Sequence, residues 1–179
     1  MSSVAPQFHY RLYGLRVASE FELPGLPPQR DDEAADITVR LGEVPTSLPD
    51  TLVEGICFKK SASEVLLLMD EAGGLRFRIY TDGQLVCQRL PGSHLDSLCH
   101  FTVAQALPVA AVLQGNCLAF HANAVVMPDG GATLIAGASG AGKSTLAGLL
   151  QQRGLPLITD DVAVIRWDED GVARVSPGQ

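Results

Sequence analysis

The chain has 179 residues, of which 46% are hydrophobic, and its formal net charge is −7. This length and composition favour one globular domain, or one and a half, and exclude a largely disordered chain. The negative charge argues against nucleic acid as the main partner, because a phosphate backbone calls for a basic surface. We interpret the charge as a property that keeps the protein soluble.

Two other protein classes do not fit the sequence. The N-terminal stretch MSSVAPQFHY has no apolar signal core, and we expect no segment to reach the roughly 18 apolar residues of a membrane span. The four cysteines, Cys57, Cys87, Cys99 and Cys117, are scattered without a C-x-x-C pair. Their spacing favours free, mostly buried thiols in a reducing cytoplasm over a disulfide framework or a zinc site.

Residues 1–91 are predicted to form a β-rich region. Short alternating segments are separated by turn signals such as Asp82-Gly83. We interpret Arg76, Arg78 and Arg89 as part of a solvated sheet face rather than a basic binding strip. The sequence leaves open whether this region recognises a substrate or mediates assembly. The predicted strands are residues 10–17, 36–41, 55–59, 64–69, 75–80 and 84–90.

A helix is predicted over residues 93–114. Ser93 is the expected N-terminal cap, and Pro108 is expected to kink or split the helix because proline has no N–H to donate. We interpret His94 and His100 as surface or packing residues, since neither has a partner at metal-ligand spacing.

The apolar run over residues 117–127 predicts a buried strand, followed by a tight turn and an antiparallel return strand. With the turn centred between Asp129 and Gly130, His121 falls opposite position 138 and next to the loop that follows. A polar group in an apolar strand needs a partner, so an active-site histidine and a buried structural histidine are both open. Asn123 shares the face of His121 and is expected to orient it or a phosphate.

The stretch GASGAGKST matches the phosphate-loop pattern G-x-x-x-x-G-K-[ST] and lies between a predicted strand and a predicted helix. Glycines let successive N–H groups turn toward an anion, and the helix N-terminus adds partial positive charge. Lys143 is expected to reach the β- and γ-phosphates, and the Ser144 hydroxyl to bind Mg²⁺. An ordinary Gly-rich turn is the alternative, which the full pattern makes the weaker interpretation. The expected nucleotide contacts are Gly137, Ala138, Ser139, Gly140, Ala141, Gly142, Lys143, Ser144 and Thr145.

A second strand, residues 155–159, ends in Asp160-Asp161 after a short helix with a predicted buried stripe of Leu146, Leu149 and Leu150. An apolar strand that ends in aspartate soon after a phosphate loop is typical of a carboxylate at Mg²⁺. One of the two can hold the metal while the other accepts a proton from an attacking hydroxyl. The alternative, that an aspartate caps the turn, is acceptable for one of them.

Taken together, H-A-N-A-V, G-A-S-G-A-G-K-S-T and G-L-P-L-I-T-D-D resemble the HPr kinase/phosphorylase family. The chain is most similar to the HPr-kinase-like serine kinases of bacterial biosynthetic clusters, including those beside lasso-peptide genes. The resemblance covers about residues 114–167. It depends on the histidine strand before the loop, on Ser139 within the loop and on the double aspartate after it.

The resemblance implies an α/β chain with a mixed α+β sheet, in which a P-loop core related to phosphoenolpyruvate carboxykinase occupies residues 92–179. It implies ATP and Mg²⁺ as cofactors and phosphoryl transfer to a serine of a peptide or small protein. It also implies a homo-oligomer. By position, His121 matches the active-site histidine, Lys143 the phosphate lysine, Ser144 the Mg²⁺ hydroxyl, Asp160 the catalytic base and Asp161 its neighbour at the metal.

The sequence departs from this family in two places. The loop ends in Ser144-Thr145, where HPr kinases have Ser-Glu. The family's later catalytic glutamate and C-terminal arginine would lie beyond Gln179, so the resemblance predicts an incomplete kinase domain. A non-catalytic nucleotide-binding regulator or scaffold is therefore an alternative. A small-molecule phosphotransferase is another, although few basic residues near the loop argue for its acid pocket.

Overall fold

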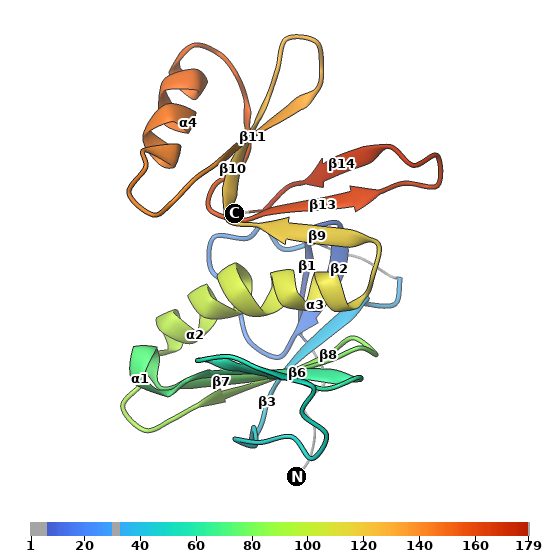
Figure 1. Cartoon of the computed structure of the whole chain (residues 1–179), viewed down its shortest axis with the longest axis vertical. Coiled ribbons are helices and arrows are strands. Elements are labelled where there is room, and N and C mark those ends of the chain that lie inside the picture. The colour runs from blue at the N-terminus through green and yellow to red at the C-terminus, as the bar shows by residue number, and fades with distance from the viewer. Residues whose placement is uncertain (1–6, 30–32, 179) are drawn as a thin grey trace. The chain divides into compact units, whose positions relative to one another are not determined.

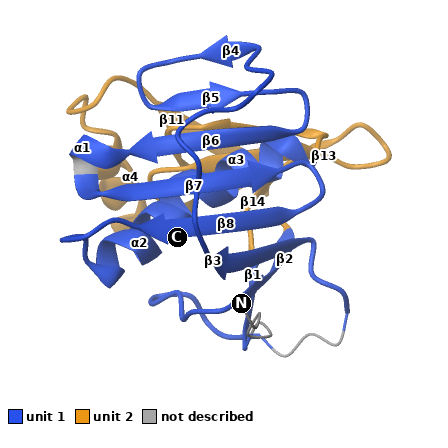
Figure 2. Cartoon of the chain, turned by 90° about the horizontal axis from the view of Figure 1, so that it is seen from below, with its two compact units in different colours: residues 1–11, 15–114 blue, residues 12–14, 115–179 orange. Residues whose placement is uncertain are grey.

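The computed structural model describes residues 7–29 and 33–178, and within them the chain is a mixed α+β protein. Unit 1 comprises residues 1–11 and 15–114, and unit 2 comprises residues 12–14 and 115–179 (Figure 2). The mixed class agrees with the sequence. The units divide after residue 114, so the helix expected to open the kinase core belongs to unit 1. The boundary of the proposed kinase domain at residues 91/92 stays a prediction.

Within the described residues, unit 1 is built on an eight-stranded mixed sheet. Its strands are β1 (Phe8–Leu12), β2 (Leu15–Ser19), β3 (Ile37–Leu41), β4 (Val53–Glu54), β5 (Phe58–Lys60), β6 (Glu64–Met69), β7 (Leu75–Tyr80) and β8 (Gln84–Arg89). Their order in the sheet is β1-β2-β3-β8-β7-β6-β5-β4 (Figure 2). β3 pairs in parallel with β2 and β8, whereas the neighbours from β8 to β4 pair antiparallel.

Hydrophobic alternation predicted the centre of this sheet well. The strands β3, β6, β7 and β8 begin and end within one residue of the predicted bounds. In β7, Leu75, Phe77 and Ile79 have an exposed fraction of 0%. Side chains two residues apart point to the same face of a strand, so these three pack into the core together.

Of the three arginines considered for this region, two are paired with acids and one with a backbone carbonyl. Arg76 donates from Nε to Asp70 Oδ1 at 2.7 Å, and Arg78 donates from Nη2 to Glu64 Oε1 at 3.1 Å. Arg89 donates to a backbone carbonyl. Because the guanidinium groups are engaged within unit 1, they do not form the basic strip that the sequence analysis had weighed.

The single strand predicted over residues 10–17 is wrong, because the chain turns back in its middle. Tyr13 has φ of 55° and Gly14 has φ of 73°. Two successive positive φ values are those of a type I′ hairpin turn. Tyrosine is an uncommon residue in that conformation, so the sequence carried little signal for the turn.

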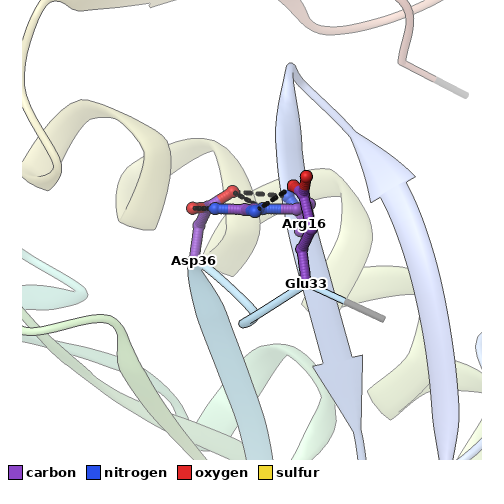
Figure 3. A network of polar contacts seen from close by, with 3 residues as sticks. All are labelled: Arg16, Glu33 and Asp36. Atoms are coloured by element: carbon purple, nitrogen blue, oxygen red, sulfur yellow. Dashed lines mark hydrogen bonds and ion pairs between the residues drawn. The ribbon is translucent and has the colours of Figure 1, made fainter. Parts of the chain in front are cut away.

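A bidentate ion pair connects β2 to the start of β3 (Figure 3). Arg16 donates to Asp36 Oδ1 at 2.7 Å and to Oδ2 at 3.1 Å, and it also pairs with Glu33. The backbone repeats the connection, since the Asp36 N–H donates to the Arg16 carbonyl at 2.9 Å. The bond to Asp36, more than Glu33, holds the pKa of the Arg16 guanidinium above its usual range. These contacts set the register at which the parallel pair begins.

The predicted helix is confirmed, with a different internal structure. It consists of α2 (Leu95–Phe101), a π-helical segment η1 (Thr102–Ala106) and α3 (Leu107–Leu113), and it lies over the sheet of unit 1 (Figure 1); one further helical turn is α1 (Asp70–Gly73). The wider turn precedes Pro108, which cannot donate a backbone hydrogen bond. The predicted cap is wrong. His94 is the N-cap, and the Ser93 hydroxyl donates to the Leu90 carbonyl at 2.8 Å instead.

By length and composition alone, the helix Leu95–Leu113 could cross a membrane, with a mean hydropathy of 1.3. This differs from the expectation that no segment reaches that length. More than half of its apolar window, 56%, is buried within the protein. Core helices of soluble proteins meet the same criterion, so the finding is weak evidence for a membrane span.

In the part of the chain that the structure describes, unit 2 has two three-stranded antiparallel sheets and one helix. The orders are β11-β10-β12 and β14-β13-β9. The elements are β9 (Cys117–Phe120), β10 (Ala122–Val126), β11 (Ala132–Ala136), α4 (Lys143–Gln152), β12 (Leu157–Thr159), β13 (Ala163–Trp167) and β14 (Ala173–Ser176).

Two predictions for unit 2 are wrong. The run over residues 117–127 is two strands in different sheets, and Leu118 and Phe120 of β9 are exposed. The predicted buried leucine stripe of α4 is largely exposed, with Leu146 at 47% and Leu149 at 52%. The buried side chain of α4 among the described residues is Ala147. The leucine spacing correctly indicated a helix, but the side chain that this helix buries is the small Ala147 and not the leucines.

No disulfide joins cysteines of the described residues, which agrees with the prediction of thiols. Cys87, Cys99 and Cys117 are buried and Cys57 is exposed. Burial raises the pKa of the Cys87 thiol to about 12, which disfavours the reactive thiolate.

The turn between β7 and β8 supplies a test of this fold. Gly83 has φ of +91°, and a Cβ there would lie 2.3 Å from the Asp36 carbonyl oxygen. We expect Gly83→Ala to lower the free energy of unfolding by about 3 kcal/mol, since strain and a backbone clash add. Gly92 is the matched control, because its φ is +90° and a Cβ there would meet no described atom within 4 Å. Gly92→Ala should cost about 1 kcal/mol. Urea denaturation measures both, and equal losses would contradict the close approach at Gly83.

Candidate functional site

Three segments of unit 2 meet at one edge of the β11-β10-β12 sheet. β10 pairs antiparallel with both neighbours, with Ala122 opposite Ala136 and Ala124 opposite Thr159. β11 and β12 therefore run in the same direction, and their carboxyl ends lie at the edge where β10 begins. The loop of residues 137–142 leaves β11 at this edge, Asp160 leaves β12, and His121 precedes β10.

The glycine-rich loop leads directly into the helix, as the phosphate-loop pattern requires. Gly140 and Gly142 have φ of +77° and +87°, values that residues with a Cβ rarely adopt. Gly142 is the N-cap of α4, and Lys143 is its first residue. The Lys143 ammonium donates to the carbonyls of Gly137 and Ala138 at 3.1 and 3.2 Å. The ammonium thus folds back over the loop. The remaining predicted contacts, Ser139, Ala141 and Thr145, are exposed on the loop and the first turn of α4.

His121 lies next to the loop, although not by the predicted register. Ala122 pairs with Ala136, so the extrapolated partner of His121 is residue 137 and not residue 138. His121 itself lies between β9 and β10, at the point where the chain passes from one sheet to the other. Its Nδ1 is 3.0 Å from Asp161 Oδ1, and both side chains are more than half exposed. It is therefore neither inside a strand nor buried.

The two adjacent aspartates have separate partners. Ser144 donates from Oγ to Asp160 Oδ1 at 3.2 Å, and the amide nitrogen of Asn123 donates to the same oxygen. Asp161, which pairs with His121, has φ of 79°. A left-handed aspartate is strained by about 1–3 kcal/mol, a cost commonly found at functional turns. The structure thus joins Ser144 to Asp160 and joins His121 to Asp161, while the Lys143 ammonium contacts the carbonyls of the loop.

Tyr13, which the sequence analysis did not consider, lies beside this turn within unit 2. It is 1% exposed, its N–H donates to the Pro177 carbonyl at 3.0 Å, and a Cβ on Gly178 would lie 2.9 Å from its ring. Burial and the negative charge of Asp161 raise the pKa of Tyr13 to about 12. No local pattern could have identified it, because more than a hundred residues separate it from the loop.

Among the described residues, no group of three or more His, Cys, Asp or Glu side chains is arranged to hold a metal. A protein-only cage of the zinc or calcium type is therefore not visible in this part of the chain. Mg²⁺ has a different requirement, because it commonly takes one or two protein oxygens together with waters and substrate phosphates. The Ser144 hydroxyl and the Asp160 carboxylate, 3.2 Å apart, are oxygen ligands of that kind.

Comparisons with protein-family models, with curated proteins and with solved structures found no match to this chain. The functional interpretation therefore depends on the residues and their geometry.

Tyr13 gives a pH-dependent prediction. Its pKa in the folded protein is about 12, above the value of about 10 in an unfolded chain. Between these pH values the unfolded state loses the phenol proton first, so the free energy of unfolding falls as pH rises. Tyr13→Phe removes this contribution, and we expect its stability to fall less than that of the parent chain between about pH 10 and 12. Urea titrations across that range measure the difference. Parallel pH dependences of the two chains would show that Tyr13 is not the group responsible.

Proposed function

We propose that the chain is an ATP-dependent serine kinase that phosphorylates a peptide or small protein, with a P-loop core of the HPr-kinase type. One observation carries this proposal. The P-loop residues Lys143 and Ser144 lie at the same sheet edge as Asp160 and Asp161, and the Ser144 hydroxyl donates to the Asp160 carboxylate. A phosphate loop with a strand-end carboxylate beside its serine is the arrangement that phosphoryl transfer from ATP requires.

In this proposal the chain's own groups position the phosphates. The backbone N–H groups of residues 138–144 and the Lys143 ammonium hold the phosphates. Without ligand, the ammonium contacts the carbonyls of Gly137 and Ala138, and it leaves them when the phosphates bind. The helix dipole of α4 adds partial positive charge at the same point. The catalytic contribution is then mainly positioning and electrostatic stabilisation.

The remaining roles follow the resemblance. The resemblance implies that Asp160 accepts the proton of the serine hydroxyl and that His121 steadies either the developing charge or Asp160. It implies that Ser144 and Asp161 hold Mg²⁺. When bound, Mg²⁺ neutralises charge on the β- and γ-phosphate oxygens. The oxygen ligands at this sheet edge fit such an ion.

The setting of the reaction is also part of the proposal. A cytoplasmic location supplies ATP and the reducing conditions that suit thiols without disulfides. The partners are ATP and a peptide or small protein that carries the acceptor serine. Nucleic acid is not expected as a partner, given the charge of −7, and neither is a membrane. A homo-oligomer is expected from the resemblance.

The central test is nucleotide binding by the full chain. We expect Lys143→Ala to weaken the affinity for a fluorescent ATP analogue at least about tenfold, because it removes the cation that faces the phosphates. Lys60→Ala, which removes an exposed lysine of β5 in unit 1, is the matched control and should bind as the parent does. Fluorescence anisotropy measures both. Undiminished binding by Lys143→Ala would contradict a phosphate loop.

Phosphoryl transfer separates the kinase from its alternatives. Radiolabelled ATP is incubated with the parent chain and a serine-containing peptide encoded nearby, and the expected product is a labelled phosphoserine. ATP binding without transfer, but with altered partner binding, would instead support the regulator or scaffold. Transfer to a small molecule would support the third alternative.

A further inference from the structure

The contacts of the two aspartates differ from those that the resemblance implies. The resemblance assigns the metal to Asp161, yet Asp161 contacts His121 at 3.0 Å. Asp160 is the aspartate beside the P-loop hydroxyl, with its Oδ1 at 3.2 Å from Ser144 Oγ. In P-loop proteins the hydroxyl of this serine and a strand-end carboxylate hold the same ion. Their contact here identifies the aspartate that is close enough to share it.

Asn123 fixes the orientation of the Asp160 carboxylate. It lies in β10, the central strand, and is 1% exposed. The register pairs Ala124 with Thr159, so Asn123 comes opposite the residue that follows β12, and its amide nitrogen donates to Asp160 Oδ1. Because a carboxylate only accepts hydrogen bonds, the amide must present its nitrogen and not its oxygen to Asp160.

The other end of this amide supplies an independent observation. Asn123 Oδ1 is enclosed and receives no hydrogen bond from any residue that the structure describes. A buried acceptor without a donor costs about 1–3 kcal/mol, so it needs a reason. The amide keeps this cost while its nitrogen donates to Asp160, which indicates that the contact with the carboxylate decides its orientation. The Ser144 hydroxyl and the Asp160 carboxylate are hard oxygens, which suit Mg²⁺ with its retained waters.

Resting on the proposed kinase function, we infer that Asp160, oriented by Asn123, is the carboxylate that holds Mg²⁺ together with Ser144. Asp161 pairs with His121 and is not a ligand of the metal. Asn123 is a positioning residue, which acts on the metal through Asp160. The metal thus falls to Asp160 and not to Asp161, to which the resemblance assigns it.

The test measures how much Mg²⁺ strengthens nucleotide binding. The full chain is titrated with a fluorescent ATP analogue in excess Mg²⁺ and again in EDTA, and the ratio of the two dissociation constants is the metal effect. We expect Asp160→Asn to reduce this ratio about tenfold or more, because it removes the negative oxygen beside Ser144. Asp161→Asn, the matched control with the same chemical change one residue away, should keep the ratio within about twofold.

Asn123→Ala tests the positioning role. We expect it to reduce the metal effect about tenfold while the dissociation constant in EDTA stays close to the parent value. A purely structural role would weaken binding in both conditions. Asn123→Ser, which keeps a hydrogen-bond donor in a smaller side chain, provides a second variant if the alanine chain does not fold, and it should also reduce the ratio. Far-ultraviolet circular dichroism checks folding.

Several results would overturn the inference. Loss of the metal effect in Asp161→Asn with retention in Asp160→Asn would restore the roles implied by the resemblance. Equal losses in both aspartate variants would remove the distinction between them. A different result would contradict the proposed function itself. In that case the parent chain would not bind the ATP analogue, either with Mg²⁺ or in EDTA.

Discussion

The candidate site depends on one constraint, the position of β10 between β11 and β12. A strand that pairs antiparallel with both neighbours makes those neighbours parallel to each other. The segments that leave β11 and β12 must then start at the same edge of the sheet. The glycine-rich loop, the Asp160-Asp161 turn and His121 are therefore brought together by hydrogen-bonded backbone. The pairing of the strands is therefore sufficient to bring these segments close to one another.

The centre of the eight-stranded sheet and the order of the site segments could be predicted from the sequence. Strict alternation in Leu75–Tyr80 and the Asp129-Gly130 turn signal determine local structure strongly, and the structure confirms both. The phosphate-loop pattern also placed Lys143 and Ser144 at the start of α4 correctly. These features are local, so a short stretch of chain contains the information that specifies them.

The features that could not be predicted depend on contacts between distant residues. The break at His121 arises because β9 pairs with β13 while β10 pairs with β11 and β12, and no apolar pattern encodes a change of sheet. The register differs by one residue because the turn is centred on Asp129. The partner of each aspartate follows from the φ of Asp161 and from the register of Asn123, and no local sequence pattern specifies either feature. The sequence therefore predicted which segments lie near one another more reliably than the contacts that each residue makes.

In the proposed kinase, the shallow burial of α4 has a consequence for how tightly the loop would hold a phosphate. Of the side chains described in α4, Ala147 is buried, and a ten-residue helix receives little support from propensity alone. The first turn of α4 is continuous with the glycine-rich loop, so fraying of the helix would also disrupt the loop conformation proposed to bind the anion. The apparent affinity would then equal the affinity of the formed loop multiplied by the fraction of molecules in which the helix is intact. Ligand occupancy and helix formation are thus two measures of a single equilibrium in this part of the chain.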